Sequence, residues 1–434
     1  MYEEKLIKLI QIPSVSIEGE KIEFKEIEEY IKDNFPNFYN ACEFKNIDGP
    51  LLFILRGKKT NNKPYLFMNH HDVVQVEGEW KYPGFGGEIH DNKIYGRGTL
   101  DTKGGLFCML QAAEELISEG FIPNRDLYFV SNNDEETNTK GGPKVVKYLE
   151  ENNITFDLIL DEGGMITYDP IGGAKGFFAM VGVGEKPCLD ILVSAKSHGG
   201  HASSPAKNTP IVRLARFVKD IEDKNIFKSK LSDTTSEMFR KMSLKMSGIK
   251  KFVFKNNKLF KPLLEKVAPN LSPAANAIFK TTCAFTKAQG SEQFNSIPET
   301  AYININMRSS LHEGYEHSVA QVKKIADKYD LGIETRYYGG IPKVSDYRTK
   351  QFKLIENTIS NIFKDVVTAP YITNTGADIR FFKNLSDNCF GFVPFIVTAE
   401  QIASIHGTNE NVDISCLEPA VKFYKELMKE TYYE

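Results

Sequence analysis

The sequence lacks two features that would each mark a class of binding protein. Its 54 Lys and Arg residues and 57 Asp and Glu residues leave a formal net charge of -3, and no basic run is interleaved with aromatic residues. Nucleic-acid surfaces depend on such a basic field, so we expect no nucleic-acid partner. No run of roughly eighteen apolar residues is present to cross a bilayer, so no membrane partner is expected either.

Paired cysteines and a secretion signal are also missing. The six cysteines stand singly at positions 42, 108, 188, 283, 389 and 416, without the spacing of a disulfide framework or of a thiolate metal site. The first residues, Met1-Tyr2-Glu3-Glu4-Lys5, are charged and are not followed by the apolar core of a signal peptide. We therefore expect reduced thiols and a cytoplasmic location.

What is present is the pattern of a large α/β protein. A chain of 434 residues is too long for one ordinary hydrophobic core, so at least two domains are expected. In the first part, apolar strands alternate with amphipathic helices, which predicts βαβ units and a mostly parallel sheet with helices on both faces. The predicted strands are 51–56, 65–69, 126–131 and 156–160, and the predicted helices are 21–34, 103–119 and 143–151.

The pattern changes after residue 166. The predicted elements there are strands at 188–194, 281–286, 301–307 and 332–337 and helices at 210–223 and 315–329, the order of a small split βαβ sandwich. A segment at 226–270, rich in Lys and Phe, is typical of a solvated helical face, with an anionic partner as the alternative. The α/β pattern resumes from 342 to a helix at 418–429. The smaller domain is therefore predicted to be inserted into a discontinuous larger one.

Imidazoles and carboxylates stand at the ends of the predicted strands. His70 and Asp72 directly follow the apolar run 65–68, where α/β sheets usually assemble ligand sites. A satisfied core histidine is the alternative for His70. Asp101 lies in a Gly-rich loop just before a predicted helix, so it is either a helix cap or a ligand.

Further acids and a second imidazole follow. Asp134-Glu135-Glu136 ends one strand with three adjacent acids, which repel one another unless a cation or protons neutralise them; an exposed acidic turn is the alternative. Asp161-Glu162 ends the next strand, and His406 stands far downstream. Carboxylates and imidazoles at successive strand ends are the donors that a two-metal hydrolytic site requires.

These motifs, taken in order, resemble those of the M20 family of zinc metallopeptidases and amidohydrolases, which includes aminoacylase-1, acetylornithine deacetylase, succinyl-diaminopimelate desuccinylase and carboxypeptidase S. The resemblance covers nearly the whole chain. It is carried by His70-His71-Asp72-Val73-Val74, Gly96-Arg97-Gly98 with Asp101 and Lys103-Gly104, Asp134-Glu135-Glu136, Leu160-Asp161-Glu162-Gly163, Gly200-His201-Ala202-Ser203-Ser204-Pro205, and His406. The Asp-Glu-Gly-Gly sequence and the long insert look most similar to the carboxypeptidase S and N-acyl amino acid hydrolase branch.

The resemblance implies a fold and a domain plan. The fold would be α/β, with a mostly parallel-sheet zinc-peptidase catalytic domain formed by residues 1–185 and 341–434. An α+β, ferredoxin-like lid and dimerisation domain would be inserted at 186–340 and would carry the extra Lys-rich helical segment at about 226–270.

The resemblance also implies a metal site with two Zn²⁺ ions, for which Co²⁺ or Mn²⁺ could substitute. His70 and Glu162 would hold one ion, Glu136 and His406 would hold the other, and Asp101 would bridge them. Asp161 stays open as an alternative to Glu162. Asp72 would orient the ring of His70, whereas His71 would point elsewhere. The family also carries a cis peptide after the bridging residue, here Asp101-Thr102.

Catalytic and substrate-binding roles are implied as well. Glu135 would be the general base. His201 would stabilise the oxyanion and, in dimeric members, arrives from the partner subunit, which implies a homodimer through the lid; a loop histidine in a Gly-rich turn is the alternative. The substrate carboxylate and its neighbours would contact Arg308, Arg380, Gly376 and Asn295, and a surface salt bridge is the competing interpretation for each Arg.

The sequence thus predicts a two-zinc hydrolase that cleaves an amide bond next to a free carboxylate in a small peptide or an N-acyl amino acid. It would act as a dipeptidase, a carboxypeptidase or an N-acyl amino acid deacylase. The rival interpretation is a non-catalytic metal- or peptide-binding protein that keeps the fold. Gln75 and Ala377 depart from the residues usual in the family and leave the preferred substrate open.

Overall fold

The computed structural model describes residues 1–434 apart from 20–22, 59–60, 138–139 and 433–434. The chain folds into two compact units. The first unit is Met1–Gly184, Glu237–Lys255 and Lys343–Glu434, and the second is Glu185–Ser236 and Asn256–Pro342. The domain limits drawn from the sequence stay a prediction; residues 237–255, which lie within the predicted insert, group with the first unit.

A large mixed sheet forms the centre of the first unit. Its strands follow the order β1-β2-β6-β3-β7-β17-β9-β8-β18, with β16 paired to β9. They are β1 (Glu43–Asn46), β2 (Leu51–Leu55), β3 (Tyr65–His70), β6 (Leu127–Asn132), β7 (Leu158–Asp161), β8 (Ile166–Tyr168), β9 (Phe177–Glu185), β16 (Val366–Thr373), β17 (Cys389–Gly391) and β18 (Ile396–Val397). A separate sheet contains β4 (Glu88–His90), β5 (Lys93–Tyr95) and β19 (Asn411–Asp413).

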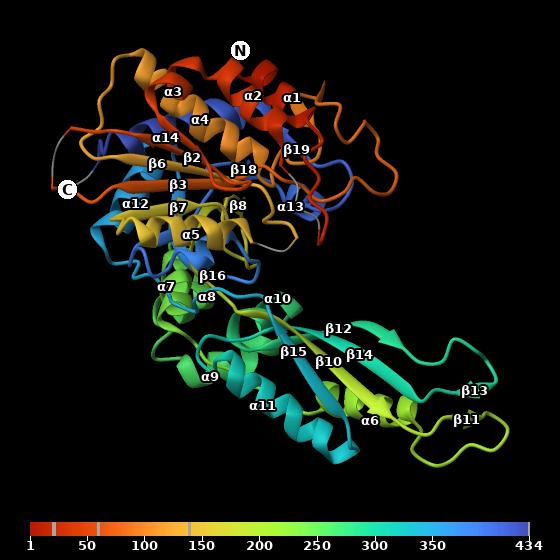
Figure 1. The fold of residues 1–434 in the computed structure, drawn as a ribbon. Coiled ribbons are helices and arrows are strands. Elements are labelled where there is room, and N and C mark those ends of the chain that lie inside the picture. The colour runs from red at the N-terminus through yellow and green to blue at the C-terminus, as the bar shows by residue number, and fades with distance from the viewer. Residues whose placement is uncertain (20–22, 59–60, 138–139, 433–434) are drawn as a thin grey trace. The chain divides into compact units, whose positions relative to one another are not determined.

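The middle of the large sheet is parallel. Strands β6, β3, β7 and β17 pair in parallel, and every residue of these four strands is buried. Parallel strands need helices on both faces, which explains why their sequences are continuous apolar runs rather than alternating ones. Two apolar clusters, one on each face, confirm this layering: one contains residues of α4 and α14, and the other contains residues of α5. Figure 1 shows α4 and α14 above the sheet and α5 below it.

The helices of the first unit surround this sheet. They are α1 (Tyr2–Ile10), α2 (Lys25–Asn34), α3 (Pro36–Ala41), α4 (Lys103–Ser118), α5 (Gly141–Glu151), α8 (Gly248–Lys255), α12 (Lys350–Ile362), α13 (Ala399–Ser404) and α14 (Leu417–Met428), with short 3-10 turns η1 (Ser243–Lys245), η4 (Asp378–Phe381) and η5 (Ile414–Cys416). Helix α7 (Asp233–Met242) includes residues of both units.

The second unit is built on an antiparallel sheet in the order β12-β14-β10-β15. Its strands are β10 (Cys188–Lys196), β12 (Thr282–Gln289), β14 (Thr300–Arg308) and β15 (Gly332–Tyr337), and β11 (Gly200–His201) pairs with β13 (Ser296–Ile297). Its helices are α6 (Pro210–Asp223), α9 (Lys261–Val267), α10 (Pro273–Phe279) and α11 (Tyr315–Ala326), with η2 (Ala268–Asn270) and η3 (Asp327–Tyr329). Alternate residues of β10 are buried, as expected for a sheet with one covered face.

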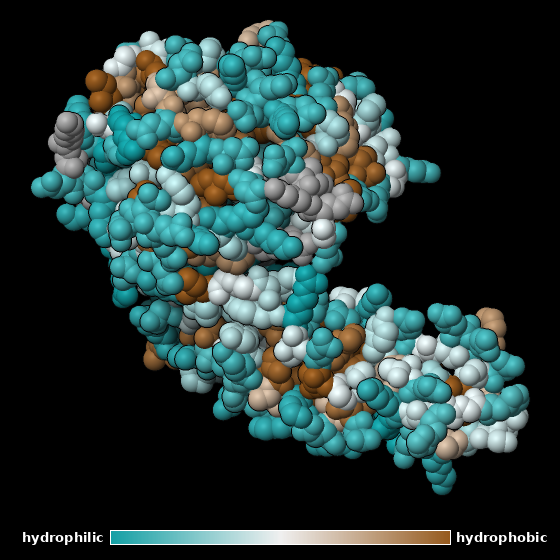
Figure 2. Space-filling view, viewed as in Figure 1, coloured by the Kyte–Doolittle hydropathy of each residue, from teal (hydrophilic) through white to brown (hydrophobic). Residues whose placement is uncertain are grey.

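The predicted α/β fold with a second, antiparallel α+β part is confirmed. In chain order, β10, α6, β12, β14, α11 and β15 give the βαββαβ arrangement of a ferredoxin-like unit. The helix predicted at 21–34 is seen as α2, and residues 20–22 at its predicted start lie outside the described residues. No helix within the described ranges is both long and apolar enough to span a bilayer. The face of the molecule in Figure 2 is mostly hydrophilic, with scattered hydrophobic patches.

Candidate metal centre

The parallel strands bring the predicted donors to one edge of the large sheet. His70 is the last residue of β3, and it pairs with Asn132, the last residue of β6. Glu135 and Glu136 follow β6 closely, and Glu162 comes directly after β7. Neighbouring parallel strands end at the same edge of the sheet. His70 and Glu162 therefore lie close together there, although they are 92 positions apart in sequence.

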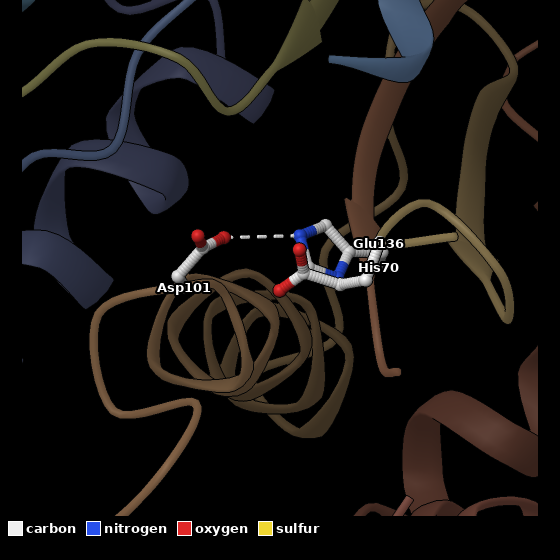
Figure 3. Close-up of side chains that lie close together, drawn as sticks. All are labelled: His70, Asp101 and Glu136. Carbon is white, nitrogen blue, oxygen red and sulfur yellow. Dashed lines mark hydrogen bonds and ion pairs between the residues drawn. The ribbon is translucent and has the colours of Figure 1, made fainter. Parts of the chain in front are cut away.

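Asp101 lies between the two imidazoles. Its Oδ1 is 3.1 Å from Nε2 of His70, and its Oδ2 is 3.1 Å from Nε2 of His406. The same nitrogen of His406 is 3.0 Å from Oε2 of Glu136, and Nε2 of His70 is 3.9 Å from Oε1 of Glu162. Figure 3 shows His70, Asp101 and Glu136 converging. One carboxylate that gives an oxygen to each imidazole has the arrangement of a bridging ligand.

The donor set fits divalent metal ions. Ligand atoms of His70, Asp101 and Glu136 all lie within 4.8 Å of one another. Oε1 of Glu136 is buried and has no hydrogen-bond partner among the described residues, a state that costs free energy unless a cation is present. Imidazole nitrogens with carboxylate oxygens suit zinc and also cobalt or manganese.

The charges of this cluster favour a bound cation. Burial raises the pKa of Glu162 well above its usual value and also raises the pKa of Glu136, and the charge of Asp101 adds to both shifts. Hydrogen bonds to Asp101 and Glu136 raise the pKa of His406 to about 10. Burial opposes ionisation of Asp101, yet its hydrogen bonds with His406 and His70 bring its pKa below the usual value. The carboxylates thus stabilise positive charge among them.

Asp72 is a fully buried anchor for two ligand-bearing segments. Nδ1 of His70 lies 2.9 Å from the backbone oxygen of Asp72 and 3.4 Å from its Oδ1. The Asp72 carboxylate also accepts hydrogen bonds from the backbone amides of Glu135 (3.1 Å) and Glu136 (3.0 Å), and from Oγ of Ser16 (2.7 Å). One side chain therefore fixes both the ring of His70 and the turn that carries the two glutamates.

A second buried anchor, which the sequence did not reveal, fixes Asp101. The carboxylate of Glu410 accepts hydrogen bonds from the amides of Gly98, Leu100 and Asp101 and pairs with Nη1 of Arg97 at 2.7 Å. Nη2 of Arg97 donates to the backbone oxygen of Gly407, 2.8 Å away. The Arg97–Glu410 pair thus ties the loop of Asp101 to the loop of His406. Arg97 stands inside a motif that the sequence did single out, and Glu410 follows the predicted ligand His406 by four residues; the burial of this pair is what the sequence does not show.

Asp161 and Glu162 point to different neighbours. Oδ2 of Asp161 accepts the backbone amide of Ile379 at 2.9 Å, whereas Glu162 faces His70. Of the two acids that the sequence left open, the geometry places Glu162 with the donors. The peptide bond between Asp101 and Thr102 is cis, as the resemblance implied.

Glu135 lies beside this donor set and contacts the guanidinium of Arg380. Its Oε1 is 3.5 Å from Nη1 of Arg380, and burial raises its pKa well above the usual value. Next to Arg380, Asp378 accepts a hydrogen bond from the side chain of Asn132, and burial raises the pKa of Asp378 to about 7. Asn132 and Asp378 are further buried polar residues at this edge to which the sequence gave no role.

Comparison with known proteins decides the family. Residues 66–430 match the model described as peptidase family M20/M25/M40. This chain belongs to that family. It is accordingly an M20 metallohydrolase of the peptidase and amidohydrolase kind, with a candidate metal site at His70, Asp101 and Glu136. Metallopeptidases of the M20 family bind a dinuclear metal centre.

Several M20 relatives resemble this chain over nearly its full length. A probable carboxypeptidase S-like 2 of Dictyostelium discoideum is 32% identical and covers 99% of this chain and 84% of its own. The N-fatty-acyl-amino acid synthase/hydrolase PM20D1 of Homo sapiens is 31% identical, with 98% and 87% covered. Among solved structures, the M20 metallo-carboxypeptidase Sso-CP2 of Sulfolobus solfataricus has a TM-score of 0.73 at 19% identity, with 99% and 98% covered.

Three of the other residues that the M20 resemblance singled out belong to the second unit, whereas the donor set belongs to the first. They are His201, Asn295 and Arg308. His201 is exposed on β11, its Nδ1 is 2.7 Å from Oγ of Ser203, and the amide of Ala202 donates to the backbone oxygen of Asn295 at 2.9 Å. Arg308 ends β14, the far end of that strand from β13. These roles stay predictions.

Gly376 lies in the first unit, in the turn between β16 and η4 that leads to Arg380. Its position beside Arg380 in sequence agrees with a place near the substrate, but its contact with substrate stays a prediction.

Proposed function

We propose that this M20 protein uses two zinc ions to hydrolyse the amide bond next to the free carboxylate of a small peptide or an N-acyl amino acid. One observation carries the proposal: Asp101 gives one oxygen to each imidazole, while Glu135 stands beside the donor set and is not itself within contact distance of either imidazole. Donors for two ions and a separate carboxylate are what metal-assisted hydrolysis needs.

The residues would divide into two ligand groups. His70 and Glu162 would hold one ion, Glu136 and His406 would hold the other, and Asp101 would bridge them. Two such ions, when bound, polarise the scissile carbonyl and make water acidic near neutral pH. Asp72, through its contacts with His70 and the amides of residues 135 and 136, would keep ligands of both groups in position.

Glu135 would move the proton. Its carboxylate would take a proton from the attacking water and return it to the departing amine nitrogen, so that the carbon–nitrogen bond breaks as the new acid forms. Arg380, 3.5 Å from Glu135, places a cation close to the reacting atoms, where it would pair with the substrate carboxylate. Gly376, in the loop that leads to Arg380, would offer a backbone amide.

The second unit would complete the site. His201 would donate a hydrogen bond to the oxyanion, and Asn295 and Arg308 would contact the substrate, with a homodimer through this unit as the proposed assembly. The relatives named carboxypeptidase S-like and N-fatty-acyl-amino acid synthase/hydrolase support both proposed substrate classes. A cytoplasmic location stays part of the proposal.

A substrate panel tests this function. The protein loaded with Zn²⁺, Co²⁺ or Mn²⁺ should release free amine from dipeptides, from C-terminally free peptides or from N-acyl amino acids, and a chelator should stop the reaction. Peptides amidated at the C-terminus should react far more slowly, because they lack the carboxylate. Stoichiometric metal binding with no turnover across the panel would favour the rival interpretation of a non-catalytic binding protein.

A further inference from the structure

An exposed apolar stripe runs along one side of the helical segment that contains α9 and η2. Its members are Leu259, Leu263, Val267 and Leu271, whose exposed fractions are 76%, 52%, 44% and 74%. They recur at every fourth residue. Leu263 and Val267 lie on one face of α9, whereas Leu259 precedes that helix and Leu271 directly follows η2. Much of the visible surface is hydrophilic (Figure 2), which makes four large exposed aliphatic side chains in one row unusual.

The opposite side of the same segment is held inside the second unit. Leu264 and Ala268 are each only 8% exposed, and Asn257 is buried and donates to the backbone oxygen of Ser236 at 2.8 Å. The carboxylate of Glu265 accepts the amide of Leu231 at 2.8 Å. These contacts fix the orientation of the segment about its own axis. The stripe therefore faces away from the interior of the second unit.

Lysines accompany the stripe. Lys258, Lys261 and Lys266 are exposed beside it, and the sequence from 241 to 266 contains eight Lys and one Glu. The whole chain has a net charge of -3, so this segment is strongly basic within an acidic protein. The eight lysines include those of α8, which belongs to the first unit and whose Ile249 and Phe252 are 83% and 58% exposed.

We propose that the stripe docks on an anionic lipid surface. Exposed aliphatic side chains flanked by lysines match the chemistry of such a surface, whose acyl region accepts the leucines and whose head groups attract the ammonium groups. A second copy of this chain fits less well, because a two-fold contact would set the lysines of one copy against those of the other. The lack of a long apolar run predicts no membrane partner; the exposure of the stripe changes that expectation.

Vesicle binding by the metal-loaded, full-length protein tests the proposal. We expect it to sediment with vesicles of phosphatidylcholine mixed with phosphatidylserine, not with phosphatidylcholine alone, and to dissociate as salt is raised. Replacing two of the three leucines of the stripe, as Leu259→Ser with Leu263→Ser, should abolish sedimentation. Neutralising the three lysines, as Lys258→Gln, Lys261→Gln and Lys266→Gln, should weaken binding by about fivefold for each lysine.

Matched variants of the same unit serve as controls. Ile211→Ser removes an equally exposed aliphatic side chain of α6, and Lys323→Gln with Lys324→Gln and Lys328→Gln removes three exposed charges near α11. Both should bind vesicles as the unaltered protein does. The proposal is overturned by absence of binding to the mixed vesicles, by equal binding of the stripe variants, or by a stripe variant that only converts a dimer to a monomer in solution.

Discussion

The predicted site residues of the first unit and those of the second differ in how they are held. In the first unit, Asp72 and Glu410 are completely buried and connect the ligand-bearing segments through backbone amides. In the second unit, His201 is exposed and its ring nitrogen Nδ1 contacts Ser203 of the same loop. The candidate metal donors are therefore preorganised within one unit.

This contrast separates binding from turnover. Metal affinity should depend on the first unit alone, because all five proposed ligands and both anchors belong to it. Turnover should depend on both units if His201 and Arg308 have the proposed roles. Each experiment below asks whether a given change affects metal binding, turnover or only the stability of the fold.

The largest effect is expected for Glu135→Gln. Loss of the proton carrier should lower kcat by about 10²- to 10⁴-fold. Bound metal should be unchanged, because Glu135 contacts Arg380 rather than the donor atoms. Steady-state kinetics with metal analysis checks both, and Glu400→Gln, at an exposed position, is the control. Full activity of Glu135→Gln would remove the assignment of the general base.

A smaller loss of turnover is expected for His201→Ala. Removal of an oxyanion donor should lower kcat by about 10²- to 10³-fold. Metal content and thermal stability should stay the same, since the side chain is exposed. Ser203→Ala, which removes only the neighbour of the ring, should cost much less. Metal loss in His201→Ala would contradict the separation of the two units.

Glu410→Gln should weaken metal binding by about 10- to 100-fold, the range for residues that position ligands. Its carboxylate accepts the amides that orient Asp101, and its loss leaves the buried Arg97 without a counter-charge. Competition with a chromogenic chelator measures the affinity. Glu430→Gln, which breaks the comparable pair with Arg125, should lower stability and leave metal affinity intact. If Glu410→Gln and Glu430→Gln lost metal affinity equally, the loss would be explained by general destabilisation of the fold.

The smallest effect concerns Lys186, a buried cation of the second unit. Lys186 precedes β10, and His201 follows that strand. The Nζ of Lys186 donates hydrogen bonds to the backbone oxygens of Ala277 and Lys280, the latter at 2.8 Å. Burial lowers its pKa from 10.5 to about 8. Between these values the unfolded chain binds the extra proton, so unfolding free energy rises with pH.

From pH 7 to pH 9 this rise should be about 1 kcal/mol for the unaltered protein relative to Lys186→Met. Chemical denaturation at the two pH values measures the difference. Lys287→Met, at an exposed position of β12, should keep the rise. A rise that persists in Lys186→Met would show that another group causes it.

The sequence revealed the site wherever strand ends carry the signal. The run before His70 and the acids after β6 and β7 predicted that these residues would meet, because parallel strands end at one edge. The sequence could not show which of Asp161 and Glu162 lies beside His70, because Asp161 instead accepts the amide of Ile379 from a distant segment.

Anchors were harder to see than ligands. Asp72 was expected to orient His70, but its bonds to the amides of residues 135 and 136 depend on tertiary packing that no spacing reveals. Arg97 and Glu410 are 313 residues apart, and neither residue type alone marks a buried pair. The helices α7 to α9 within the Lys-rich segment were predicted only as helical in general, because their short lengths give little periodicity.

The place of β17 in the sheet has a consequence for the protein while it is being made. This strand, Cys389–Gly391, lies between β7 and β9, and Glu410 reaches the loop of Asp101 only after it. A ribosome that has added the first 380 residues therefore holds a chain whose central sheet is split and whose Asp101 loop is not yet anchored by Glu410. The nascent chain should be most exposed to aggregation and proteolysis at that stage, and it should acquire metal only when synthesis is nearly finished.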